Sequence, residues 1–140
     1  MESVKHTGSC LCRGVRFEIE GQLAQVQLCH CQQCRKASGT VFASNIPINA
    51  DKFKLLTGKD LLKAYESSPG KKRVFCLQCG SPIYSERPSN PGNIRIRAGT
   101  LDGDVQTTPA FHFYTDSKAN WYQITDHLQQ FPDAPSQNAK

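Results

Sequence analysis

Seven cysteines, grouped in three short clusters, constrain the fold of this 140-residue chain more than any other feature. The first cluster is Cys10 and Cys12, the second, here called the claw, is Cys29, Cys31 and Cys34, and the third is Cys76 and Cys79. An odd number of cysteines, all inside clusters, fits metal ligation in a reducing compartment better than a disulfide framework. Zinc is the usual partner of clustered thiolates, because it is redox-inert, binds sulfur well and takes about four ligands.

The seven sulfurs divide most simply into one closed site of four and one open site of three. A metal that joins sequence-distant pairs constrains the unfolded chain most, so the first and third clusters are expected to share a metal. The claw then keeps one position open for water or substrate. Spacing alone leaves two alternatives open. Cys29 and Cys31 can pair with the third cluster instead, and His30 or His112 can complete the claw.

Alternating patterns predict a mainly β fold in a single domain. Val15, Phe17 and Ile19 alternate with charged residues, which is typical of a strand with one wet face, and extended chain would turn Cys10 and Cys12 to the same side. Further strands are expected at 26–28, twice within 41–56, at 94–98 and at 110–114, and segment 61–66 is expected to be a strand or one helical turn. The claw should lead into a loop or brief helix, and the aromatic segment 120–124 should pack back on the core. No segment of ten residues has a helical period.

The length predicts one domain, placed at residues 1–131, followed by a polar, proline-containing tail at 132–140 that is expected to be disordered. The net charge of +5 favours an anionic small molecule or an acidic surface as partner. The chain starts without a signal-like apolar segment, and no window reaches the roughly 18 apolar residues of a membrane span. A cytoplasmic protein without membrane association is therefore expected, with the oligomeric state, a homodimer included, left open.

The ordered blocks GSCLCRGVRF, CHCQQCRKASG, RVFCLQCGSPIYSE, RAGTLDG and AFHFYTDSKANW resemble those of the glutathione-dependent formaldehyde-activating enzyme (GFA) family, which also contains centromere protein V. The resemblance runs from about Thr7 to Trp121. It implies a Mss4-like, β-tent fold with two zinc ions, one structural in the first and third clusters and one catalytic in the claw. It also implies the family's named activity, the joining of glutathione to formaldehyde as S-(hydroxymethyl)glutathione, a carbon–sulfur lyase type of reaction.

The open claw suggests a mechanism in which a substrate thiol such as glutathione binds the catalytic zinc, loses its proton and adds to a small aldehyde. Three thiolates already weaken the Lewis acidity of the metal, so thiol capture is favoured over carbonyl activation. The candidate substrate-binding residues are Arg35, which adjoins the claw, with Ser38, Gly39 and Phe42, and further cations at Lys36, Arg95 and Arg97. The alternative for each arginine is a solvent-facing charge, for Gly39 a turn, and for Phe42 a core aromatic.

Two other functions compete with the lyase. The first is a non-catalytic zinc module that binds protein or nucleic acid, with both metals structural. Nucleic acid is disfavoured as a partner, because the chain has no basic stripe with interleaved aromatics and no recognition helix. The second is a redox-sensing thiol cluster that releases zinc when oxidised.

Overall fold

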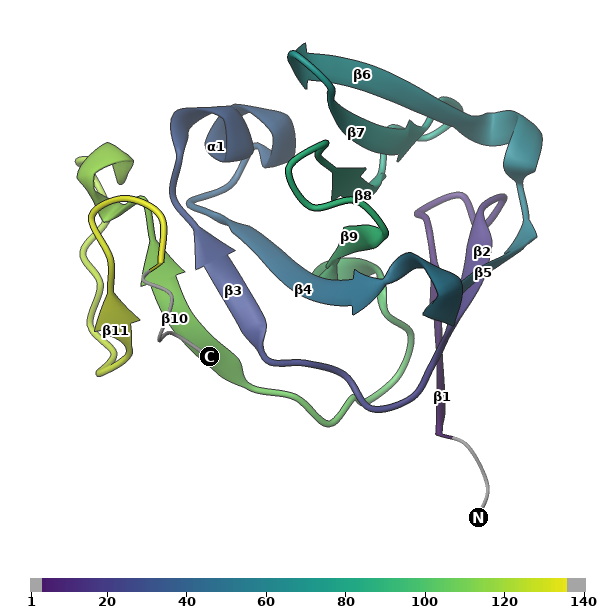
Figure 1. Ribbon diagram of the computed structural model, residues 1–140, viewed down its shortest axis with the longest axis horizontal. Helices are drawn as coiled ribbons and strands as arrows, with labels where there is room; N and C mark the ends of the chain where they lie inside the picture. Colours follow the sequence, from purple (N-terminus) through teal and green to yellow (C-terminus); the bar gives the residue numbers. More distant parts are fainter. Residues whose placement is uncertain (1–3, 136–140) are drawn as a thin grey trace. The chain divides into compact units, whose positions relative to one another are not determined.

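Short β-strands dominate the regular structure of the chain, for which a computed structural model describes residues 4–135 (Figure 1). The strands are β1 (Lys5–Ser9), β2 (Arg16–Glu20), β3 (Val26–Cys29), β4 (Ala43–Asn49), β5 (Phe53–Thr57), β6 (Leu62–Ser68), β7 (Lys71–Cys76), β8 (Pro82–Glu86), β9 (Asn93–Arg97), β10 (Pro109–Phe113) and β11 (Gln129–Gln130). The helices are α1 (Gln32–Ser38) and the single 3₁₀ turns η1 (Ala50–Lys52), η2 (Lys59–Leu61), η3 (Ala98–Thr100) and η4 (Thr115–Ser117). The mainly β class predicted from the alternating patterns is confirmed.

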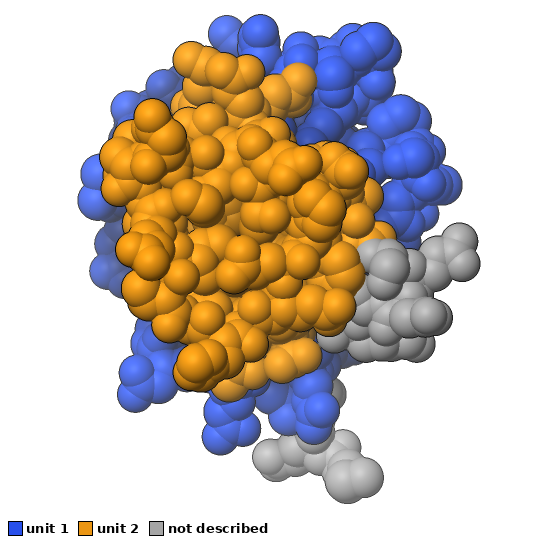
Figure 2. Space-filling view, turned by 90° about the vertical axis from the view of Figure 1, so that its left-hand side faces the viewer, with its two compact units in different colours: residues 1–24, 46–106 blue, residues 25–45, 107–140 orange. Residues whose placement is uncertain are grey.

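The described residues form two compact units, coloured separately in Figure 2. Unit 1 contains residues 4–24 and 46–106, and unit 2 contains residues 25–45 and 107–135. Each unit is therefore assembled from two stretches that are distant in the sequence. Strand β4 begins in unit 2 and ends in unit 1.

Unit 1 is built on antiparallel pairing. Strands β1, β2 and β5 form a three-stranded sheet, and β9, β8, β7 and β6 follow one another in a second sheet. In β2 the alternation seen in the sequence has its expected effect, because Phe17 and Ile19 are buried while Arg16 and Glu20 are exposed. The segment at 61–66, which the sequence left between strand and helical turn, is largely strand β6.

Two parts of unit 1 differ from expectation. Strand β1 was not among the strands expected from the sequence. Its Gly8 pairs with Phe17 and leaves room for the Phe17 ring, because a Cβ on Gly8 would lie 2.1 Å from the ring carbon Cζ. The prediction that Cys10 and Cys12 sit in extended chain is wrong. They lie in a tight turn closed by the Arg13 N–H, which donates to the Cys10 carbonyl at 3.0 Å, and Arg13 has a left-handed φ of 64°.

Unit 2 contains adjacent strands in the order β11, β10, β3, β4, with β3 and β10 side by side in Figure 1. Strands β10 and β3 are parallel, and β3 and β4 are antiparallel. Its core is an aromatic cluster of Phe111, Phe113 and Phe131, in which the claw sulfurs and Ala43 take part. The claw therefore rests against apolar side chains rather than open water.

The C-terminal part of unit 2 departs from the prediction for segment 120–124. Trp121 is 70 % exposed, so its indole does not pack on the core. Tyr122 is half-buried and places its ring 6.4 Å from that of Phe42. At the chain end, the carbonyl of Asp133 accepts a hydrogen bond from the Tyr114 N–H at 2.9 Å. Residues 136–140 of the expected disordered tail lie outside the described residues, and the boundary at residue 131 stays a prediction.

Candidate metal centres

The first and third cysteine clusters come together within unit 1. The sulfurs of Cys10, Cys12, Cys76 and Cys79 all lie within 4.8 Å of one another. Two of the distances are 3.5 Å, from Cys10 Sγ to Cys12 Sγ, and 3.8 Å, from Cys12 Sγ to Cys76 Sγ. Tetrahedral zinc with Zn–S bonds of about 2.3 Å spaces its sulfurs by about 3.8 Å. The four side chains therefore fit a closed zinc site.

Tight turns aim hydrogen-bond donors at these sulfurs. The Val15 N–H donates to Cys10 Sγ at 3.2 Å, and Ser81 Oγ lies 3.3 Å from Cys79 Sγ. The Ser81 hydroxyl and its backbone N–H lower the pKa of Cys79 to about 5. Gly80, with φ at 81°, supplies the left-handed residue of the turn and donates its N–H to the Cys76 carbonyl. These donors favour the thiolate form of Cys79, whereas desolvation and the neighbouring sulfurs raise the pKa of Cys12 to about 11, so the four thiolates together need a metal.

The claw lies in unit 2, where strand β3 runs into helix α1. Cys29 ends β3, Cys31 is the N-cap of α1, and Cys34 lies in its first turn. The three sulfurs lie within 4.8 Å of one another, and Cys31 Sγ accepts a hydrogen bond from the Cys34 N–H at 3.3 Å. The helix forms here because the capping sulfur satisfies one of its first N–H groups.

The three clustered sulfurs of the claw can all be ionised only if a cation is bound to them. The pKa of Cys29 is raised far above its ordinary value, first by the neighbouring sulfurs of Cys31 and Cys34 and then by burial. Cys29 and Cys34 are each only 3 % exposed, so water cannot relieve the repulsion between thiolates. A soft divalent metal removes that repulsion, and three sulfurs fit such an ion while leaving one coordination position to another donor. No histidine joins either sulfur group among residues 4–135.

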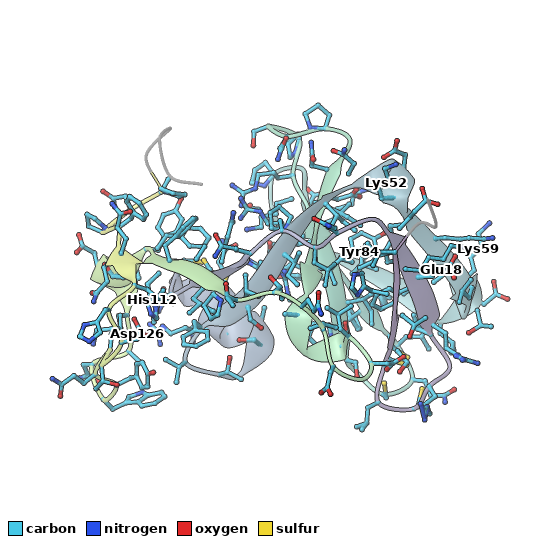
Figure 3. All side chains as sticks on the ribbon, turned by 90° about the horizontal axis from the view of Figure 1, so that it is seen from below. Glu18, Lys52, Lys59, Tyr84, His112 and Asp126 are labelled. Atoms are coloured by element: carbon cyan, nitrogen blue, oxygen red, sulfur yellow. The ribbon has the colours of Figure 1, made fainter. Side chains whose placement is uncertain are left out.

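A buried histidine pair extends from the claw, and sequence reasoning missed it. His30, which the sequence offered as a possible claw ligand, is fully buried, and its Nε2 lies 2.8 Å from His112 Nδ1. The Nε2 of His112 in turn lies 2.9 Å from Asp126 Oδ2, and Figure 3 shows these two side chains together. The second ring nitrogen of His30, Nδ1, is buried without a hydrogen-bond partner among the described residues.

The hydrogen-bonded side chains of His30, His112 and Asp126 differ in charge. Burial lowers the pKa of His30 to about 4, with smaller electrostatic contributions in the same direction from His112, Lys118 and Arg35. The hydrogen bond from His112 lowers the pKa of Asp126, with a further contribution from the Leu128 N–H. Asp126 is therefore an acceptor at neutral pH, His112 Nε2 donates to it, and His30 is neutral.

The four residues expected to bind substrate gather around α1 with different roles. Arg35 Nε donates to the Ser117 carbonyl at 3.2 Å, which ties α1 to η4. Ser38 Oγ donates to the Cys34 carbonyl at 2.7 Å, and Gly39 ends the helix at a left-handed φ of 69°. Both stabilise the helix end, a structural role that accounts for these residue types. The ring of Phe42 packs edge-on against His30, at 5.2 Å between centroids.

The other cations considered for substrate binding are divided between the units. Lys36 lies in the last turn of α1, whereas Arg95 and Arg97 belong to β9 in unit 1. Arg97 is buried, and its Nη1 donates to the Arg95 carbonyl at 3.3 Å. Its guanidinium therefore has a structural hydrogen bond and is not a solvent-facing charge.

Among the described helices, none is long and apolar enough to cross a membrane.

Comparisons with known proteins identify the family of this chain and support its fold. An uncharacterized lyase of Schizosaccharomyces pombe is 21 % identical over 127 residues, which cover 91 % of this chain and 90 % of that protein. A crystal structure of a Rhodobacter sphaeroides protein superposes with a TM-score of 0.61 at 23 % identity, covering 74 % of this chain and 99 % of that one, and this likeness supports the fold alone. The model of the glutathione-dependent formaldehyde-activating enzymes matches residues 5–117. Because this match covers most of the sequence, including all three cysteine clusters, the chain belongs to the glutathione-dependent formaldehyde-activating enzyme family.

Proposed function

We propose that this protein is a zinc-dependent carbon–sulfur lyase that joins a small thiol, such as glutathione, to a small aldehyde and releases it again. The observation that carries the proposal is the difference between the two sulfur groups. Four sulfurs converge in unit 1, whereas only three converge at the claw. A site with three protein ligands leaves a position for substrate, which is the mark of catalytic rather than structural zinc. The family supplies the substrate class, because its name specifies glutathione and formaldehyde.

The reaction forms one carbon–sulfur bond. The thiol gives up its proton, its sulfur attacks the aldehyde carbon, and the carbonyl electron pair moves to oxygen, which takes up a proton to become a hydroxyl. When bound, zinc would supply the claw with a lower pKa for a thiol at the open position. The Cys31 cap fixes the start of α1, and the aromatic cluster of unit 2 packs against the claw sulfurs.

The residues around the claw have separate tasks in this proposal. Arg35 offers a cation next to the claw for a carboxylate of the thiol, with geometry suited to two parallel hydrogen bonds. Phe42 forms an apolar wall beside His30. Ser38 and Gly39 end α1, and their direct contact with substrate stays a prediction.

The first experiment measures zinc per chain in the wild type and in Cys34→Ser, together with glutathione binding by calorimetry. We expect about two zinc ions in the wild type and about one in the variant, and the variant should no longer bind glutathione. One zinc ion in both proteins without thiol binding would overturn the lyase proposal. It would favour a non-catalytic zinc module instead.

A further inference from the structure

The residue between two claw ligands has no task in the metal centre or in the proposed reaction. His30 stands between Cys29 and Cys31 in the sequence, is fully buried and does not belong to the sulfur group. Burying an imidazole away from water costs free energy unless its nitrogens are hydrogen-bonded, and an apolar side chain would fill the space without that cost. A histidine at this position therefore needs an explanation other than packing.

Hydrogen bonds join His30 to the surface of unit 2 through two further side chains, and we call His30, His112 and Asp126 the histidine chain. His30 Nε2 lies 2.8 Å from His112 Nδ1, and His112 Nε2 lies 2.9 Å from Asp126 Oδ2 (Figure 3). The Leu128 N–H donates to Asp126 Oδ1 at 3.0 Å, which holds the carboxylate in place. The Asp126 side chain is 45 % exposed and His112 is buried, so the histidine chain runs from the surface to the claw segment.

The histidine chain holds His30 at a second point, in addition to its backbone. The His30 N–H donates to the Phe113 carbonyl at 3.0 Å, and Phe113 follows His112 in β10. The ring of Phe42 packs edge-on against the imidazole from another side. The backbone and the ring of His30 are thus both fixed to the same strand.

Fixing His30 restricts the two sulfurs on either side of it. Successive peptide planes are connected only by the soft torsions φ and ψ of the residue between them. The φ and ψ of His30 therefore help to set the relative direction of the Cys29 and Cys31 side chains, and two anchors on β10 hold these torsions. Residues that orient metal ligands from outside the ligand set change metal affinity by about 10- to 100-fold when they are replaced.

We propose that His112 and Asp126 are positioning residues of the claw, which act through the ring of His30 to hold the Cys29 and Cys31 sulfurs in the arrangement that binds zinc. The inference rests on the proposed function, which places a metal in the claw, and it adds two residues outside the sulfur group to that site. The hydrogen bonds of the histidine chain carry the effect, and the charge of Asp126 by itself does not.

Three variants in unit 2 separate the hydrogen bond from the charge. Asp126→Ala removes both the acceptor of His112 and a negative charge, whereas Asp126→Asn removes the same charge and keeps an acceptor oxygen. Asp133→Ala is the control, because it removes a carboxylate from another exposed position. Since the Asp126 side chain reaches the surface, these changes spare the buried core.

Two measurements report on the claw itself. Competition with a chromophoric chelator gives the Kd for zinc, and the absorption bands of the Co(II)-substituted protein report the geometry of the sulfur ligands. The Cys31→Ser/Cys34→Ser protein, in which only the four-sulfur group is complete, supplies the baseline that is subtracted in both. Neither measurement needs a thiol or an aldehyde, so the result does not depend on turnover.

In Asp126→Ala, the Kd of the claw for zinc should rise about tenfold or more, and the Co(II) bands of the claw should shift. Asp126→Asn should lie closer to the wild type than Asp126→Ala does, because the amide oxygen still accepts from His112. Asp133→Ala should match the wild type. A role confined to the stability of the fold would lower the free energy of unfolding without changing the Kd or the Co(II) bands.

The inference is overturned if the claw of Asp126→Ala binds zinc and Co(II) as the wild type does. Equal losses in Asp126→Asn and Asp126→Ala would also overturn it, since the charge alone would then act on the metal. A wild-type claw that takes up no zinc overturns both this inference and the proposed function. If only the proposed function fails, zinc binding at the claw still depends on Asp126, but glutathione does not bind the zinc-loaded wild type in calorimetry.

Discussion

Removing the four-sulfur group should lower the free energy of unfolding more than removing the claw does. Two matched double variants test this difference. Cys76→Ser/Cys79→Ser removes half of the four-sulfur group, and Cys31→Ser/Cys34→Ser removes most of the claw. Each pair takes away one buried and one half-buried sulfur. Differences in lost packing are therefore small, and the comparison isolates the effect of the metal cross-link.

The expected magnitude follows from the length of chain that each metal closes. A metal joining Cys10 to Cys79 closes a loop of about 70 residues, and in the chain-entropy model of a cross-link this contributes about 4 kcal/mol. The claw spans about six residues from Cys29 to Cys34, for which the same model gives about 2 kcal/mol. Small domains are stable by about 5 to 15 kcal/mol. Loss of the four-sulfur site can therefore unfold much of the protein, whereas loss of the claw should leave it folded.

The assay is urea unfolding of zinc-loaded protein, followed by far-ultraviolet circular dichroism, with zinc content measured on the same samples. The Cys76→Ser/Cys79→Ser protein should lose about 2 kcal/mol more free energy of unfolding than the Cys31→Ser/Cys34→Ser protein. The claw variant should stay folded and lose one zinc ion. Equal losses in the two variants, or a larger loss in the claw variant, would refute the cross-link reasoning.

Three further changes probe particular contacts. Gly8→Ala drives a methyl group into the facing aromatic ring of β2 and should cost about 1 to 3 kcal/mol in urea unfolding, whereas Gly99→Ala, with open space around it, should be near neutral. Burial raises the pKa of Tyr84 above its ordinary 10.0, so the unfolded chain releases this proton first and stability falls as the pH rises above that value. Tyr84→Phe should therefore lose less stability than the wild type as the pH is raised from about 9.5 to about 11, and parallel losses would contradict this. Asp126→Asn replaces the charged acceptor of His112 Nε2 by a neutral amide and should lower the thermal midpoint at pH 7, where the carboxylate is ionised. An unchanged midpoint would show that the buried histidine pair does not depend on it.

Local patterns were sufficient to predict the fold class and the candidate metal ligands. Alternation reports directly on which side of a strand is buried, and Phe17 and Ile19 follow it in β2. Clustered cysteines likewise mark metal ligands, because thiolates a few residues apart need a cation wherever they lie in the fold. Where backbone conformation mattered, the same reasoning failed: Cys10 and Cys12 sit in a turn that includes a left-handed residue, which period-2 spacing does not reveal.

Only the tertiary structure decided what surrounds the claw. His112 meets His30 across 82 positions of sequence because β10 lies parallel to β3 with His112 opposite Leu28. A pocket in unit 2, lined by Lys118, residues 120–124 and Gln130, likewise joins segments that are separate in the sequence. The sequence by itself determined the sulfur donors and the mainly β class, since both follow from spacing along the chain. Strand pairing and register determined the histidine pair, because contacts between distant residues leave no periodic signal in the sequence.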